Sequence, residues 1–261
     1  MAGRGRRTAA GARRRKWVLL LAGFAVLVVA AVAGVVTAFP SVAATTCPGC
    51  YGLERLRPGV YAEPGLSEDQ RRHVVEVVEQ AHQRVRDFYG GQKSSPSVLV
   101  CLTDTCYRRI GGGRERGIAV LNRAVMLSPH GADPVIASHE LSHVELHARL
   151  AGGAEQVPQW FDEGLAVLVS DDRRYLARET AGDRCLVDSR EALPVTLEDW
   201  LRMAGTDHQT YAKAACQVNR WVQANGGRDA VLELIEQLSA GGDFGQIMAS
   251  ARSGGDAAGA S

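Results

Sequence analysis

A stretch of 23 residues without a charged side chain, Trp17 to Phe39, most constrains how this chain can fold. Valine, leucine and alanine dominate the stretch, and as a helix rising ~1.5 Å per residue it would be roughly 34 Å long. That length is enough to cross the ~30 Å hydrocarbon core of a bilayer, and core helices of soluble domains seldom have so long an uncharged run. The sequence therefore predicts one N-terminal transmembrane helix over residues 17–39.

The charges are divided unevenly on either side of this stretch. Seven of the 30 Lys and Arg residues lie in residues 1–16, whereas the first acidic residue is Glu54. Because positive flanks stay on the cytoplasmic side, we expect a basic cytoplasmic head and an extracytoplasmic body on the outer face of the cell membrane. A cleaved signal peptide is the alternative, since small residues follow at 41–44, but its apolar region is usually ~7–15 residues long.

The body itself is mildly acidic. Once the head is set aside, 23 bases face 29 acids, a formal charge of −6. Nucleic-acid binding needs a clustered basic face, so this composition argues against DNA or RNA as a partner. The membrane is therefore the partner that these features predict, and nucleic acid is not expected.

All six cysteines lie after the apolar segment, on the expected outer side. An even number of cysteines in an exported protein indicates disulfides, although six cysteines allow 15 connectivities. Pairing of neighbours is the simplest hypothesis, and it gives Cys47–Cys50, Cys101–Cys106 and, by elimination, Cys185–Cys216. A redox role for the Cys47-Pro-Gly-Cys50 motif and a structural zinc site are alternatives that suit the spacing and context less well.

The body divides into a lead-in, a main domain and a tail. Residues 40–66 are rich in proline and glycine and indicate a linker, and residues 250–261 indicate a disordered tail. Between them, residues 67–240 show helical periodicity, then short apolar runs, then helices again, which is the order of an α+β domain. The expected strands cover 97–102 and 118–127, the second as one strand or a tight pair, and later helices are expected over 134–150, 160–169, 197–203, 211–224 and 230–238.

His139-Glu140-x-x-His143 is an H-E-x-x-H motif inside the helix expected over 134–150. Histidines four residues apart lie on one helical face, so both imidazoles can point at one cation. Zinc suits such a pair because it accepts nitrogen and oxygen ligands in a tetrahedron. Glu140 can take a proton from a zinc-bound water, whose pKa falls toward ~7, and can pass that proton to a leaving amine. The motif predicts zinc with Glu140 as general base.

A catalytic zinc site of this kind needs a third protein ligand, and Glu163 is the candidate. It follows His143 by twenty residues, after the turn signals Gly152-Gly153 and Pro158. A second helix that runs back against the first would bring its carboxylate to the zinc. Two histidines and one glutamate leave one coordination position for water, which is the arrangement of catalytic zinc sites.

H-E-L-S-H followed by W-F-D-E-G-L-A resembles the gluzincin metallopeptidases, the group that includes thermolysin and aminopeptidase N. The nearest resemblance is to small bacterial domains called peptidase MA-like, and it covers roughly residues 97–238. It implies a thermolysin-like zincin fold, in which a small mixed sheet packs on the active-site helix and a helical subdomain follows. It also implies His139, His143 and Glu163 as zinc ligands, Glu140 as general base, and a sheet edge within 118–127 on which a peptide lies by strand addition.

The resemblance further implies a tyrosine or histidine that stabilises the oxyanion of the tetrahedral intermediate. Tyr211 is the candidate because similar domains have a tyrosine opening the helix after the ligand helix, with His208 as the second choice. A packing role for Tyr211 is the alternative.

The chain departs from the thermolysin pattern at one position. An aspartate four residues after the third ligand orients a ligand histidine in those enzymes, and Val167 stands here instead. Asp162, Asp171 and Asp172 are the candidates for that role, because histidine ligands normally donate their second N–H to such a partner. His147 lies one turn beyond His143, and we expect it on the surface or among these supporting residues.

Two related peptidase patterns are absent. The metzincin spacing requires Gly and His where this chain has Leu146 and Arg149, and the G-A-M-E-N motif of aminopeptidases is missing, so an endopeptidase is favoured over an exopeptidase. The prediction is a single-pass membrane-anchored zinc metallopeptidase. Two alternatives stay open: a zinc-binding scaffold or binding domain with little hydrolytic activity, and an anchored envelope protein without a metal.

Overall fold

The computed structural model describes residues 36–150 and 157–257, together with residues 17, 21–24, 27 and 34. The expected basic head at 1–16 and most of the expected anchor at 17–39 lie outside the described residues. Among the residues that are described, no helix is both long and apolar enough to span a bilayer.

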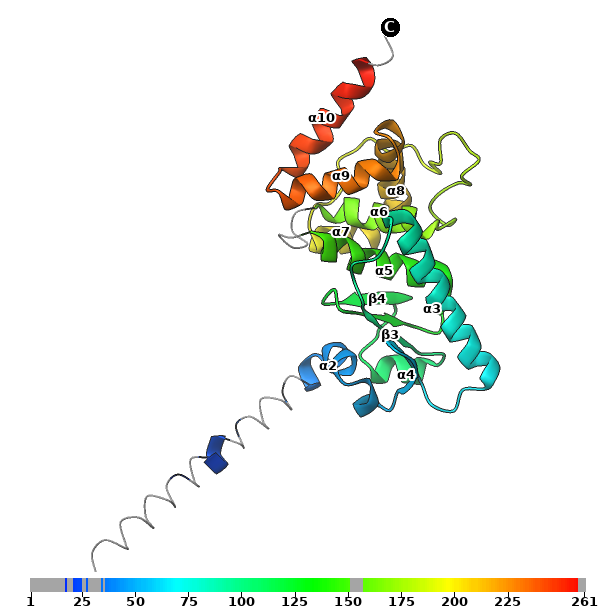
Figure 1. Ribbon diagram of the computed structural model, residues 1–261, viewed down its shortest axis with the longest axis vertical. Coiled ribbons are helices and arrows are strands. Elements are labelled where there is room, and N and C mark those ends of the chain that lie inside the picture. The colour runs from blue at the N-terminus through cyan, green and yellow to red at the C-terminus, as the bar shows by residue number, and fades with distance from the viewer. Residues whose placement is uncertain are drawn as a thin grey trace, which may run out of the picture.

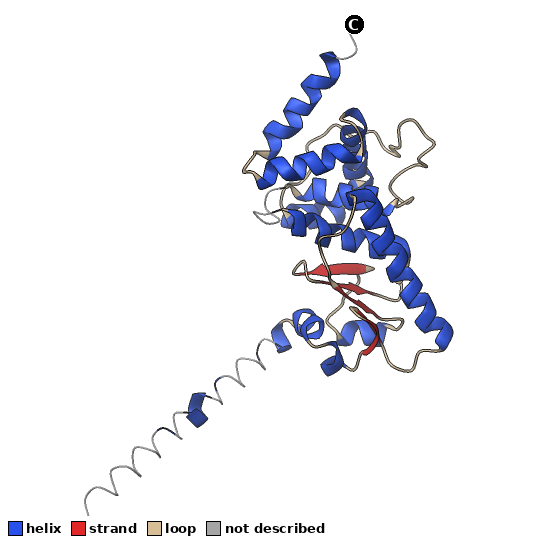
Figure 2. Cartoon of the chain, viewed as in Figure 1, coloured by secondary structure: helices blue, strands red, loops and turns tan. Residues whose placement is uncertain are grey.

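Five short strands form one mixed sheet in the order β1-β2-β3-β5-β4 (Figure 2). The inner pairs β2–β3 and β3–β5 are parallel, and the outer pairs β1–β2 and β4–β5 are antiparallel. The expected run 118–127 is therefore a tight pair of strands, and β4 lies at an edge of the sheet. The strands are β1 (Glu54–Arg57), β2 (Val60–Ala62), β3 (Ser97–Val100), β4 (Gly117–Val120) and β5 (Ala124–Leu127).

Helices cover both faces of the sheet (Figure 1). Val98 and Val100 of β3 belong to the larger core, which also contains residues of α3 (Glu68–Tyr89) and α5 (Pro134–Arg149). Leu99 points to the opposite face, into a smaller core with residues of α2 (Pro40–Thr46) and α4 (Asp104–Arg109). Because alternate side chains of a strand face opposite sides, burial on both sides explains why β3 is apolar from Val98 to Val100.

A helical layer follows the sheet in the chain and stacks on α5 (Figure 1). Asp133 caps α5 by accepting hydrogen bonds from the Val135 and Ile136 amides, and Pro134 occupies its first turn. The expected helical subdomain is present, and its members are α6 (Gln159–Ser170), α7 (Leu197–Ala204), α8 (Thr210–Ala224), α9 (Arg228–Ser239) and α10 (Phe244–Ala257).

Gly164 allows α6 and α8 to approach closely. A Cβ atom at this position would lie 2.6 Å from the Ala214 carbonyl oxygen and 2.7 Å from a Val218 methyl carbon. We expect Gly164→Ala to lower the free energy of unfolding by about 1–3 kcal/mol, because backbone must move to make room. Thermal denaturation measures this effect, with Gly182→Ala as the control, since nothing lies within 4 Å of a Cβ there. Equal melting temperatures for the two variants would contradict the packing argument.

The structure corrects the expected boundaries at both ends of the body. Residues 40–66 are not a plain linker, because they form α2, a 3-10 turn at Pro48–Tyr51 and the strands β1 and β2. The proline and glycine residues there end these short elements, and β2 pairs with β3, so the sheet includes this segment. At the other end, α10 continues to Ala257, past the expected start of a disordered tail at 250.

All three disulfides join the cysteine pairs expected from the sequence: Cys47–Cys50, Cys101–Cys106 and Cys185–Cys216. Cys101–Cys106 connects the end of β3 to α4, within the smaller core. Cys185–Cys216 ties the long irregular segment after α6 to α8, the helix that carries Tyr211.

Candidate metal centre

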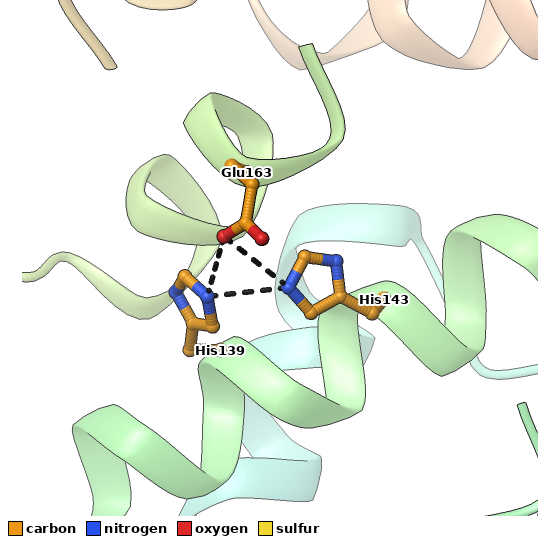
Figure 3. A group of neighbouring side chains, drawn as sticks. All are labelled: His139, His143 and Glu163. Atoms are coloured by element: carbon orange, nitrogen blue, oxygen red, sulfur yellow. Dashed lines mark hydrogen bonds and ion pairs between the residues drawn. The ribbon is translucent and has the colours of Figure 1, made fainter. Parts of the chain in front are cut away.

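The structure brings His139, His143 and Glu163 together from two adjacent helices (Figure 3). The two histidines lie one turn apart on α5, and Glu163 lies on α6, which packs against it. Nε2 of His139 is 3.2 Å from Nε2 of His143 and 3.3 Å from Oε2 of Glu163, and the third side of this triangle is 3.7 Å. These three side chains form a group that can hold a metal ion.

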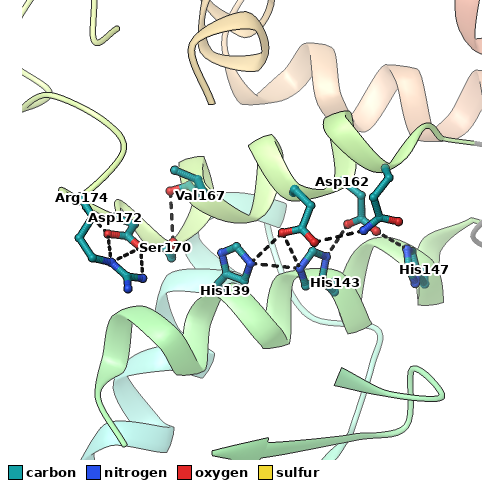
Figure 4. Close-up of polar contacts among 10 residues, drawn as sticks. His139, His143, His147, Asp162, Val167, Ser170, Asp172 and Arg174 are labelled. Carbon is teal, nitrogen blue, oxygen red and sulfur yellow. Dashed lines mark hydrogen bonds and ion pairs between the residues drawn. The ribbon is translucent and has the colours of Figure 1, made fainter. Parts of the chain in front are cut away.

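The carboxylate of Asp162 holds His143 from the far side of its ring (Figure 4). Its Oδ1 accepts a hydrogen bond of 2.6 Å from Nδ1 of His143. That bond fixes the ring orientation and turns Nε2 toward the triangle, which is the usual support for a histidine ligand. Gln159, on the first turn of α6, supports the third member by donating from Nε2 to Oε1 of Glu163 at 3.1 Å.

The electrostatics of the cluster favour positive charge among these side chains. Burial opposes a charge on His143, but the neighbouring Asp162 and Glu163 carboxylates outweigh it and raise the pKa of His143 to about 10. Burial likewise opposes ionisation of Glu163, yet its hydrogen bond to His139 and the nearby histidines lower the pKa of this carboxyl. Two nearly buried carboxylates next to two imidazoles therefore need positive charge, which either protons or a metal ion supplies.

Glu140 lies beside the triangle and against the edge strand. Burial raises the pKa of its carboxyl, which the nearby histidines and the backbone of Ala119 in β4 partly offset. Gly117 makes this contact possible, because a Cβ there would lie 2.8 Å from Cγ of Glu140 and 3.0 Å from a methyl carbon of Ile136. The motif glutamate thus contacts β4 and lies near the three side chains of the triangle.

Two residues are expected from the sequence to stabilise an oxyanion. Tyr211 lies next to the triangle formed by His139, His143 and Glu163, and His208 does not. The Tyr211 ring centroid lies 6.4 Å from that of His139, and the ring stacks on Tyr175 with centroids 5.1 Å apart. Burial and the Glu163 carboxylate raise the pKa of Tyr211, so its phenol keeps its proton as a donor. His208 is exposed, and among the described residues no contact joins it to the triangle.

The structure also selects among the aspartates proposed to replace the missing thermolysin aspartate. Asp162 contacts His143, whereas Asp171 pairs with Arg173 and Arg184, and Asp172 pairs with Arg174. Val167, which stands at the thermolysin position, is fully buried in a small apolar cluster. The carboxylate that supports His143 therefore directly precedes Glu163 in the chain and does not lie one turn after it.

Comparisons with protein-family models, with curated proteins and with solved structures find no match for this chain. The functional interpretation therefore rests on the geometry of this site and on the sequence motifs.

Proposed function

We propose that this chain is a zinc metallopeptidase of the gluzincin type, with His139, His143 and Glu163 as zinc ligands. The single observation that carries the proposal is the size of the donor triangle. Ligand atoms at about 2.0–2.1 Å from a tetrahedral zinc ion lie about 3.3–3.4 Å from one another. Two of the observed separations, 3.2 and 3.3 Å, are close to that spacing, and the third, 3.7 Å, is slightly longer.

The donor chemistry favours zinc over the harder cations. Two imidazoles and one carboxylate suit zinc, whereas calcium and magnesium prefer sites built from oxygen. When bound in such a site, zinc lowers the pKa of a coordinated water toward about 7 and polarises a substrate carbonyl. Three protein ligands are the number found in catalytic zinc sites, whereas structural sites have four.

The chain's own residues supply the proton transfers and the positioning. Glu140 is next to a ligand histidine but outside the triangle, so its carboxylate is free to take a proton from water and to donate it to the leaving amine. The protonated phenol of Tyr211, whose ring lies beside that of His139, would donate a hydrogen bond to a developing oxyanion. Asp162 keeps the Nδ1 proton of His143 in place during these steps.

We propose that the substrate is an extended peptide or protein segment that adds to the edge strand β4. This strand pairs with β5 on one side, and the absence of a side chain at Gly117 allows it to lie against Glu140. A peptide paired to its other side would pass the site along its length, as an internal stretch of a longer chain does. We further propose that a transmembrane anchor at 17–39 holds the enzyme at the cell membrane, with the domain outside the cytoplasm.

Metal analysis and peptide cleavage by the full-length chain, purified in a mild detergent, test this proposal. We expect about one zinc per chain, cleavage within the peptides of a mixed library, loss of cleavage after chelation and recovery when zinc is returned. Absence of bound metal would refute the zinc site. Bound zinc without any cleavage would instead support a zinc-binding scaffold.

A further inference from the structure

A row of four side chains leads from the metal triangle to the turn between β4 and β5. Asp162 Oδ2 accepts a hydrogen bond of 2.7 Å from Nε2 of His147, in the last turn of α5 (Figure 4). The other ring nitrogen of His147, Nδ1, lies 2.8 Å from the Asn122 side-chain amide. Asp162 contacts His143 through its remaining oxygen. The order is therefore Asn122, His147, Asp162, His143.

The turn presents Asn122 to α5 through an unusual backbone conformation. Leu121 and Asn122 both have positive φ, 50° and 52°, in a turn closed by a hydrogen bond from the Arg123 amide to the Val120 carbonyl. Asparagine tolerates the left-handed region better than most residues, whereas leucine does not. The hairpin that contains the edge strand is thus joined to the metal-bearing helix by a side chain from its turn.

We propose that His147 and Asn122 are positioning residues that act on the metal site through Asp162. A carboxylate held at one oxygen only can rotate about its terminal torsion, which is a broad one. With His143 on Oδ1 and His147 on Oδ2, both oxygens of Asp162 are fixed, and the Asp162 and His147 side chains are only 7% and 13% exposed. The direction in which His143 presents Nε2 is then set by the hairpin turn as well as by α5 and α6.

The row of contacts from Asn122 through His147 and Asp162 to His143, which we call the relay, connects the hairpin that contains the edge strand β4 to the metal site. β4 contacts Glu140 at Gly117 and Ala119 and is followed by the turn that carries Asn122. A peptide that pairs with β4 would therefore contact the same hairpin that holds His147. This inference rests on the proposed metal site, so the test measures metal binding directly and does not depend on cleavage.

Substitution of His147 in the full-length chain tests the relay. His147→Leu removes the hydrogen bond to Asp162. His147→Gln keeps a donor, because the glutamine side-chain amide extends about as far from the backbone as the imidazole Nε2. We expect His147→Leu to weaken Zn²⁺ and Co²⁺ binding about tenfold, the lower end of the effect usual for residues that support metal ligands. We also expect it to change the visible absorption spectrum of bound Co²⁺, and His147→Gln to recover most of both properties.

The controls separate positioning from simple stability. His73→Leu replaces an exposed histidine on α3 and should leave metal affinity and the Co²⁺ spectrum unchanged. Asn122→Ala should shift both in the direction of His147→Leu, but less. Wild-type affinity and spectrum in His147→Leu, or equal impairment of the Gln and Leu variants, would overturn the relay while leaving the metal site intact. A wild-type chain that binds no metal would overturn the site itself.

Discussion

Replacement of Glu140 by glutamine is expected to slow peptide cleavage about a thousandfold, the middle of the range for loss of a general acid-base group. Glutamine has nearly the same shape as glutamate but cannot take a proton from water. Glu140 lies outside the donor triangle, so the variant should still bind about one zinc per chain. Initial rates on a mixed peptide library, measured beside the metal content of the same sample, give both results.

The matched control for this prediction is Glu76→Gln, which makes the same change at an exposed position of α3. It should retain the wild-type rate and metal content. Equal cleavage by wild type and Glu140→Gln would remove the motif glutamate from the mechanism. Loss of zinc in Glu140→Gln would show that this carboxylate belongs to the metal site and has no separate role as base.

The fold could be predicted best where a local signal had one interpretation. Helical periodicity predicted α5 almost to the residue, 134–150 against the observed Pro134–Arg149, and a short apolar run predicted β3 within 97–102. The segment 40–66 was missed because its strands are only three or four residues long and gain their stability from pairing. Proline and glycine in such a segment mark its turns and do not exclude strands between them.

The residues of the candidate site also differ in how well the sequence predicts them. The ligand spacing on α5 is fixed by helix geometry, so two members of the triangle follow directly from the motif. The prediction of Glu163 also depended on α6 packing back against α5, which the turn residues between the two helices indicated. The Asn122–His147–Asp162 contacts depend on where a hairpin turn meets the end of a helix, and sequence spacing does not encode that meeting. The only signal for His147 was its place on the same helical face as both ligands.

The second large effect is expected from His143→Ala. This substitution should lower the zinc content from about one per chain to near zero, because only two protein ligands remain of the three that a catalytic site uses. It should also destabilise the metal-free protein by about 1–3 kcal/mol, since Asp162, nearly buried, loses one of its two imidazole partners and keeps only His147. Dialysis followed by metal analysis measures the first effect, and chemical denaturation in a chelator measures the second.

Thermal denaturation with and without added zinc distinguishes this site from any other that binds the ion. Zinc should raise the melting temperature of the wild type, because a ligand that binds only the folded state stabilises it. The same addition should leave His143→Ala unchanged, whereas the exposed-residue control His130→Ala should respond as the wild type does. A zinc-dependent rise that persists in His143→Ala would place the stabilising ion elsewhere. The carboxylates of Asp162 and Glu163 would then be balanced by protons on the histidines, and the chain would have no zinc with which to hydrolyse a peptide at this site.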